Sequence, residues 1–148
     1  MSDTPKHSVS VAGIVVRDDG RVLAVRRRDN HHWEPPGGVL ELAETFDQGV
    51  RREVLEETGI EVQVERLAGV YKNMLRGIVA IVFRCSPVGG QLTPTAEASS
   101  VRWLTIQEIQ QRMDPAYVVR VTDAFASQAS ARVHDGVNLV HTRTQTLL

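Results

Sequence analysis

Cysteine is almost absent from this chain of 148 residues, since Cys85 is its one example. An intramolecular disulfide is therefore impossible, and the apolar run GIVAIVFRC around Cys85 predicts a buried, unreactive thiol. A chain that forms no internal disulfide suits a reducing compartment.

Long apolar runs are also missing. No run approaches the roughly 18 residues that a membrane-spanning helix needs, and the polar start MSDTPKHSVS contains no apolar signal core. We therefore expect a cytoplasmic protein with no membrane partner.

The chain has no large excess of charge of either sign. Its 17 Lys and Arg residues nearly balance its 18 Asp and Glu residues, and it has no basic tail. This pattern excludes the electrostatic footprint of a protein that binds nucleic-acid polymers. The expected partner is a small molecule, and self-association, including a homodimer, is left open.

The length and the apolar fraction of 42% predict one domain over residues 1–148. A domain of this size can bury a sufficient core without a disulfide or a metal, so a metal would be present for function. The expected core covers about residues 8–126. The tail, residues 127–148, is ambiguous between disorder and an added strand, GVNLVHT.

The order of the predicted elements indicates a mixed α and β fold. Strands are expected at residues 8–16, 21–27, 61–72, 77–88 and 98–104, and helices at 46–58, from 105 onward and at 115–126. The Asp-Gly pair at 19–20 predicts that the first two strands pair antiparallel, and WEPPGG predicts a shaped loop. Because strands and helices do not alternate regularly, a mixed sheet with helices packed on it is expected.

Residues 37–60, GGVLELAETFDQGVRREVLEETGI, contain a well-marked helix. Thr45 and Gln48 form a predicted capping box, and Gly59 supplies the C-terminal stop. Phe46, Val50 and Val54 recur at i, i+4 and i+8 and are expected to face the sheet.

The same helix gathers three glutamates, Glu53, Glu56 and Glu57, beside its apolar stripe. Two carboxylates about 4 Å apart repel by roughly 4 kcal/mol at an effective dielectric constant of about 20, and this cluster also opposes the helix dipole. A bound cation would relieve the repulsion. An all-oxygen site favours a hard ion such as Mg²⁺ or Mn²⁺.

At this point the segment resembles the signature of the Nudix hydrolase family (MutT-like), G-x5-E-x7-R-E-U-x-E-E-x-G-U, in which U is aliphatic. The matching positions are Gly38, Glu44, Arg52, Glu53, Val54, Glu56, Glu57, Gly59 and Ile60. The loop WEPPGG is similar to the family's entry loop. Glu97, six residues before Trp103, resembles its additional acidic residue.

The resemblance implies a Nudix-type α/β/α sandwich with a mixed sheet. It also implies divalent-metal-dependent hydrolysis of the pyrophosphate bond of a nucleoside diphosphate linked to another group X. Mg²⁺ is the expected cofactor, and Mn²⁺ can substitute. The implied metal ligands are Glu53, Glu56, Glu57 and the backbone carbonyl of Gly37.

The implied catalytic group comprises Glu53, Glu97 and Arg52. Glu53 is preferred over Glu97 as the base that accepts the proton of the attacking water. Arg52 is expected to orient Glu53 and to pair with Glu44. Glu44, Gly38 and Gly59 are supporting residues.

Arg26 and Arg28 are candidates for binding a substrate phosphate. They belong to the run Arg26 to Arg28 just before the entry loop, and strand alternation lets one or two of these side chains face a cleft. The alternative is a solvated strand end.

Two other classes of function are weighed against the enzyme. A non-catalytic Nudix-fold module that senses nucleotides is expected to lack box glutamates, and none is lost here. An acidic interaction helix without metal would show no stabilisation by Mg²⁺. The identity of group X is open, because the subfamily marks for ADP-ribose and for dinucleoside polyphosphates are absent near Leu75 to Ile78.

Overall fold

The structure is a computed structural model and describes residues 3–93 and 95–140. Its elements in chain order are β1 (Ser8–Val15), β2 (Val22–Arg27), β3 (Trp33–Glu34), β4 (Gly37–Val39), α1 (Phe46–Thr58), β5 (Ile60–Asn73), β6 (Ile78–Gly90), β7 (Ala98–Leu104), α2 (Ile106–Arg112), α3 (Pro115–Asp123) and β8 (Ser130–His134).

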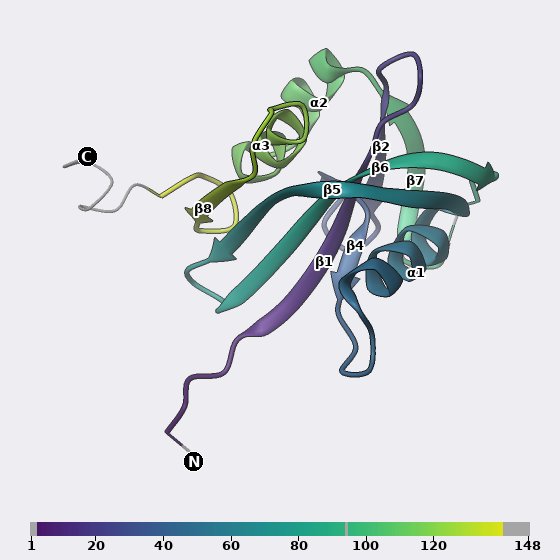
Figure 1. Cartoon of the computed structure of the whole chain (residues 1–148). Coiled ribbons are helices and arrows are strands. Elements are labelled where there is room, and N and C mark those ends of the chain that lie inside the picture. The colour runs from purple at the N-terminus through teal and green to yellow at the C-terminus, as the bar shows by residue number, and fades with distance from the viewer. Residues whose placement is uncertain (1–2, 94, 141–148) are drawn as a thin grey trace.

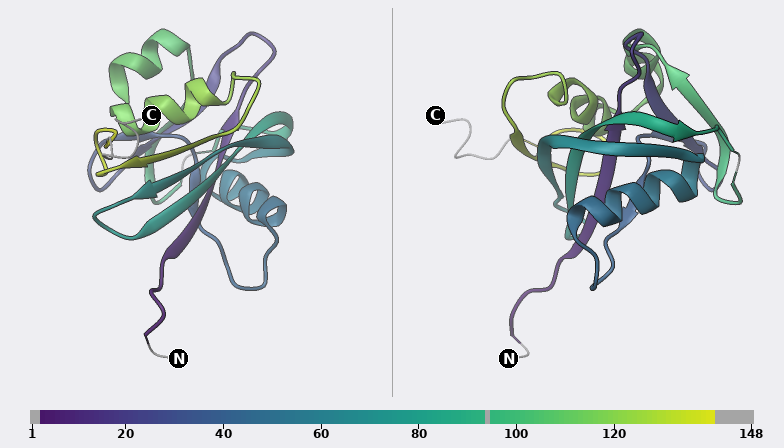
Figure 2. Two further views of the ribbon diagram at one scale, coloured as in Figure 1. Left: turned by 60° about the vertical axis from the view of Figure 1, so that its left-hand side comes forward. Right: turned by 45° about the vertical axis from the view of Figure 1, so that its right-hand side comes forward.

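Two sheets form the centre of the molecule. The larger has the strand order β4-β1-β6-β5-β8 and is mixed, because β1 is parallel to β6 and β5 is parallel to β8. The smaller, β3-β2-β7, is antiparallel. Helix α1 lies on one side of the larger sheet, and α2 and α3 lie on the other (Figures 1 and 2). The predicted mixed α and β sandwich is confirmed, whereas the smaller sheet was not predicted.

Strand β1 supplies both apolar layers, because successive side chains of a strand point to opposite faces. Val11 and Val15 belong to the cluster that includes Val50 of α1. Ala12 and Ile14 belong to the cluster that contains Ile109 of α2 and Val121 of α3. The sheet thus separates the glutamate helix from the C-terminal helices.

The predicted hairpin pairing of the first two strands is wrong. Strands β1 and β2 lie in different sheets, and the chain between them forms an isolated bridge between Val16 and Val22 and a hydrogen bond of 2.9 Å from the Arg17 amide to the Arg21 carbonyl. Both edges of β1 are already occupied, by β4 and by β6. The turn at Asp19 and Gly20 therefore connects a strand of the larger sheet to a strand of the smaller sheet.

Helix α1 begins and ends as predicted. The Thr45 hydroxyl accepts from the Gln48 amide at 3.2 Å, the Gln48 side chain accepts from the Thr45 amide at 2.9 Å, and Gly59 closes the helix with φ 80°. Val50 and Val54 are buried, whereas Phe46 is 48% exposed although its ring lies against Phe83 of β6 in the sheet. Phe46 is the first helical residue, and its ring lies at the end of the packed stripe beside Phe83.

The C-terminal part also differs from the prediction. Helix α3 ends at Asp123 rather than near residue 126, and a strand forms at Ser130–His134, before the segment GVNLVHT. Within GVNLVHT, Leu139 makes an isolated bridge to His134, and residues 141–142 lie outside the described part of the chain. Strand β8 joins the sheet because it pairs with β5 in parallel.

Two smaller predictions concern burial and the entry loop. Cys85 is fully buried, as predicted, and burial raises the pKa of its thiol to about 12, which disfavours the reactive thiolate. The loop WEPPGG contains the short strands β3 and β4 on either side of its two prolines. Among the helices of residues 3–93 and 95–140, none is long and apolar enough to cross a membrane.

Candidate active site

The glycines of β4 lie directly against the glutamates of α1. The Gly37 amide donates a hydrogen bond of 2.8 Å to Oε1 of Glu57. At Gly38 a Cβ atom would lie 2.5 Å from Oε2 of Glu53, so a side chain at this position would displace that carboxylate. Strand β4 therefore holds the two partly buried glutamates at the edge of the sheet.

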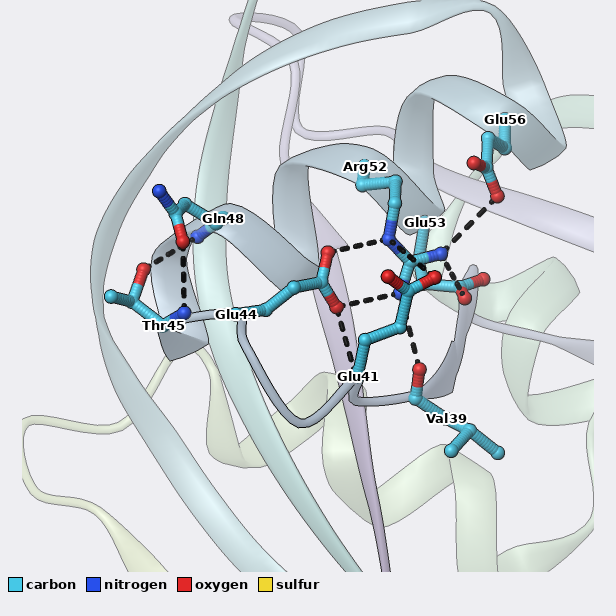
Figure 3. A network of polar contacts seen from close by, with 8 residues as sticks. All are labelled: Val39, Glu41, Glu44, Thr45, Gln48, Arg52, Glu53 and Glu56. Atoms are coloured by element: carbon cyan, nitrogen blue, oxygen red, sulfur yellow. Dashed lines mark hydrogen bonds and ion pairs between the residues drawn. The ribbon is translucent and has the colours of Figure 1, made fainter.

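Arg52 connects the loop after β4 to the helix α1 (Figure 3). Its Nε and Nη2 donate to the two oxygens of Glu44 at 2.5 and 2.8 Å, and Nη2 also donates to the carbonyl of Val39 at 3.1 Å. Its Nη1 donates to Glu53 at 2.8 Å and to Glu56 at 3.3 Å. The expected pairing with Glu44 and contact with Glu53 are both present in the structure.

The environment separates the glutamates into two electrostatic classes. Burial, with further repulsion from Glu53, raises the pKa of Glu57 to about 7, although the Gly37 amide opposes the shift. Burial also raises the pKa of Glu53. In contrast, the hydrogen bonds from Arg52 lower the pKa of Glu44 to about 2. Glu44 is thus charged at neutral pH and is held by Arg52. For Glu53 and Glu57, in contrast, burial makes ionisation less favourable.

This donor set fits a hard divalent cation. The carboxylates of Glu53 and Glu57 are partly buried and repel each other, so a nearby dication would stabilise their charged forms. No three His, Cys, Asp or Glu side chains in residues 3–93 and 95–140 converge closely enough to hold a metal as they stand. Glu53 and Glu56 instead accept hydrogen bonds from Arg52.

Two further predicted residues, Glu97 and Gly59, lie outside the contacts of Arg52 and β4 described above. Glu97 is exposed in the turn before β7, and its charge is one of those that raise the pKa values of Glu53 and Glu57. A Cβ atom at Gly59 would lie 2.2 Å from the carbonyl oxygen of Gln91, so this glycine also allows a close backbone approach.

A cavity of about 630 Å³ opens on the sheet face that α3 covers. Gly37 and Gly38 line one part of it, and Tyr117 and Arg120 of α3 line another. Glu34 also contributes to the wall, and burial raises the pKa of its carboxyl group. The cavity therefore connects the glycines beside the carboxylates with helix α3.

Of the three consecutive arginines, Arg27 is the one that lines this cavity, where it pairs with Glu34 at 3.7 Å. Arg26 donates to the carbonyl of His31 at 3.2 Å. Arg28 donates to three carbonyls, of Thr95, Ala96 and Ala98, at 3.4, 3.0 and 3.2 Å. These bonds connect Arg28 at the end of β2 to the turn that carries Glu97. Phosphate binding by Arg26 and Arg28 stays a prediction.

Sequence reasoning did not single out Glu34, Tyr117, Arg120 or His134, all of which line the cavity. Glu34 had a local signal, because it precedes the two prolines of the entry loop. The others are distant in sequence from the glutamate helix, and no spacing pattern connects them to it.

Comparisons with known proteins agree with the geometry. The family model described as NUDIX domain matches residues 6–124. A MutT-like protein of Streptomyces ambofaciens is 57% identical over 137 residues, which cover 92% of this chain and 89% of that protein. An ADP-ribose pyrophosphatase of Methanocaldococcus jannaschii is 31% identical over 109 residues, covering 69% of this chain and 64% of that protein.

Solved structures agree as well. The crystal structure of a MutT protein from Methanosarcina mazei has a TM-score of 0.70 and 29% sequence identity, and the match covers 83% of this chain and 94% of that one. The family match over most of the chain, the intact box and the arrangement of Arg52, Glu53 and Glu57 lead to one conclusion. The chain belongs to the Nudix hydrolase family.

Proposed function

We propose that this protein is a divalent-metal-dependent pyrophosphohydrolase that cleaves a nucleoside diphosphate linked to another group X. The observation that carries the proposal is the pair of partly buried glutamates, Glu53 and Glu57, packed against Gly37 and Gly38. These two glycines, but not the glutamates, line the cavity. Repulsion between two partly buried carboxylates destabilises the fold. A divalent cation would remove this repulsion, and the same cation could bind an anionic pyrophosphate.

The metal-binding residues in this proposal are Glu53, Glu56, Glu57 and the carbonyl of Gly37. When bound, Mg²⁺ or Mn²⁺ neutralises phosphate charge and lowers the pKa of the attacking water. We take Mg²⁺ as the physiological ion because oxygen ligands suit it. A single domain acting in the cytoplasm completes the proposal.

The protein's own residues then have distinct tasks. Glu53 accepts the proton of the attacking water, with Glu97 as the alternative base. Arg52 is a positioning residue, because it holds Glu53 through Nη1 while its other nitrogens are fixed by Glu44. The glycines of β4 leave the space in which the carboxylates and the pyrophosphate meet.

The test is a Mg²⁺-dependent hydrolysis screen over nucleoside triphosphates, nucleotide sugars, ADP-ribose and dinucleoside polyphosphates. We expect turnover of at least one class, and we expect Glu57→Gln and Glu53→Gln each to reduce it by about a thousandfold or more. Glu61→Gln, which changes an exposed glutamate at the start of β5, is the matched control and should retain full activity.

Variant activity close to wild type in excess Mg²⁺ would contradict the assignment. Binding of a nucleotide with Mg²⁺ but without any turnover would indicate a sensor module instead. Identical melting temperatures with and without Mg²⁺ would indicate an acidic interaction helix that binds no metal.

A further inference from the structure

Arg120 of α3 is a buried cation without an anionic partner among the described residues. Its side chain is 7% exposed and lies between two aromatic rings, 5.1 Å from the ring centre of Tyr71 and 4.7 Å from that of Tyr117. No carboxylate of residues 3–93 and 95–140 forms an ion pair with it, and its Nε has no hydrogen-bond partner. Burying a charge in this way is costly unless something compensates for it.

The nearby carboxylates are already engaged. Glu34 influences Arg120 electrostatically, but it forms its ion pair with Arg27 at 3.7 Å. Asp123, on the same helix, accepts two hydrogen bonds from Arg132, both of 2.8 Å, and one from Tyr71 of 2.7 Å. Two aromatic ring faces, rather than a carboxylate in an ion pair, therefore flank Arg120.

His134 of β8 adds a second donor at the same place. Its Nε2 lies 3.3 Å from Nη2 of Arg120, and the side chain is 2% exposed. The Gly136 amide donates to Nδ1 of the ring at 2.9 Å, so Nδ1 is an acceptor and the neutral ring carries its proton on Nε2. Two N–H groups then face each other, and neither has an acceptor. An oxygen of a ligand can accept from both.

Both donors line the cavity of about 630 Å³ that also reaches Gly37 and Gly38. Arg76, on the turn between β5 and β6, contributes a further positive side chain to its wall. Helix α1, with the box glutamates, lies on the opposite face of the sheet from α3 (Figure 2). A group bound by Arg120 and His134 is therefore a different part of the ligand from the pyrophosphate that the glutamates engage.

We propose that Arg120 and His134 bind an anionic group, a phosphate or a carboxylate, that the substrate carries in addition to its pyrophosphate. This inference rests on the proposed function in taking the cavity as the substrate site. It narrows the substrate class to nucleoside diphosphate derivatives with a second anionic group. Charge-assisted hydrogen bonds from a buried arginine contribute enough affinity to discriminate such a substrate from its uncharged counterpart.

The first test measures anion binding without catalysis. Metal-free protein in a chelator is melted with and without inorganic phosphate. At ten times the phosphate dissociation constant, we expect the wild-type melting temperature to rise by about 3 to 6 °C. Arg120→Met and His134→Gln should lose this rise, while Arg51→Gln, which removes an exposed charge from α1, should keep it. An equal rise in wild type and Arg120→Met would overturn the proposal.

Two variants keep the test decisive if one of them folds poorly. Arg120→Met replaces an unpaired buried cation with an apolar side chain of similar length, which is often neutral or stabilising. His134→Gln leaves the arginine in place and removes the second donor. Folding of either one is sufficient to compare its phosphate response with that of wild type.

The second test uses substrate pairs that differ by one anionic group: UDP-glucuronate and UDP-glucose, ADP-ribose with and without a 2′-phosphate, and coenzyme A with and without its 3′-phosphate. Wild type should prefer the anionic member of at least one pair by about tenfold or more in kcat/KM, mainly through KM. Arg120→Met should bring that ratio close to one. A wild-type ratio near one for every hydrolysed pair would overturn the proposal.

The two proposals fail in different ways. Without hydrolysis of any substrate, the proposed function fails, yet metal-free wild type can still respond to phosphate through Arg120. With hydrolysis but no phosphate response and no preference for the anionic member, only the second-anion site fails.

Discussion

A carboxyl group that is buried beside other carboxyl groups keeps its proton to a higher pH, and Glu57 is such a group. Its pKa is raised to about 7, first by burial and then by the charges of Glu53, Glu34 and Glu97. The Gly37 amide supplies one hydrogen bond, which does not offset the burial. The charged forms of these carboxylates are destabilised by burial and by mutual repulsion, and a bound cation would stabilise them.

The pH dependence of the metal-free protein follows from this shift. Between the ordinary pKa of 4.5 and about 7, the folded state binds more protons at Glu57 than the unfolded state, so stability falls as pH rises through this window. Glu57→Gln should remove this fall and should melt at a higher temperature than wild type at pH 8. Melting curves at pH 5 to 8 in a chelator measure the difference between the two proteins.

The difference is the relevant quantity, because the lowered pKa of His134 acts in the opposite direction in both proteins and cancels. Added Mg²⁺ should stabilise wild type more at pH 8 than at pH 5.5, since protons compete with the metal. Parallel pH profiles for wild type and Glu57→Gln would refute the role of Glu57.

At the scale of elements, Arg52 connects the loop after β4 to α1. One guanidinium group contacts the Val39 carbonyl, both oxygens of Glu44 and the carboxylates of Glu53 and Glu56 (Figure 3). Only a planar fork with several fixed donors can make these contacts at once. The loop and the helix are therefore locked together by geometry as well as by charge.

Arg52→Lys tests this lock, because it keeps the charge and removes the fork. We expect kcat to fall by about 10- to 100-fold with a small change in KM, since Glu53 loses its orientation while the cavity is unaltered. Steady-state kinetics with saturating Mg²⁺ measures the effect. Arg51→Lys, which affects an exposed ion pair with Asp47, is the control and should behave as wild type. Wild-type kcat in Arg52→Lys would mean that Arg52 supplies charge alone.

At the scale of the whole molecule, the C-terminal residues complete the fold. Strand β8 pairs with β5, and Arg132 on β8 donates twice to Asp123 at the end of α3. Asp123 in turn accepts from the hydroxyl of Tyr71 in β5. The carboxylate of Asp123, which is 5% exposed, thus joins β8, α3 and β5. These contacts hold α3 over the cavity.

Arg132→Met should destabilise the protein by about 2 kcal/mol, because it removes the cationic partner and two hydrogen bonds of a buried carboxylate. For a chain of this length the melting temperature should fall by about 4 to 8 °C. In an Asp123→Asn background the same substitution should cost much less, as a double-mutant cycle would show. Arg102→Met, at an exposed position on β7, should have little effect. Equal costs in both backgrounds would show that the two residues are not coupled.

Local residue patterns determined much of this protein. The capping box at Thr45 and Gln48, the stop at Gly59 and the burial of Val50 and Val54 are short-range features, and all of them are present in the structure. The spacing of the glutamates likewise placed Glu53 and Glu57 on one side of a helix. The family follows from the same short-range pattern, whereas the mixed fold follows from the order of the predicted strands and helices along the chain.

Tertiary structure decided what depends on residues far apart in the chain. The strand at residues 8–15 pairs with β4 and β6 rather than with its sequence neighbour, because those strands occupy both its edges. Arg27 lines the cavity instead of Arg26 or Arg28. Arg120 and His134 meet because α3 and β8 pack beside β5. Sequence periodicity carries no information on such contacts, since burial and pairing are set by the sheet as a whole.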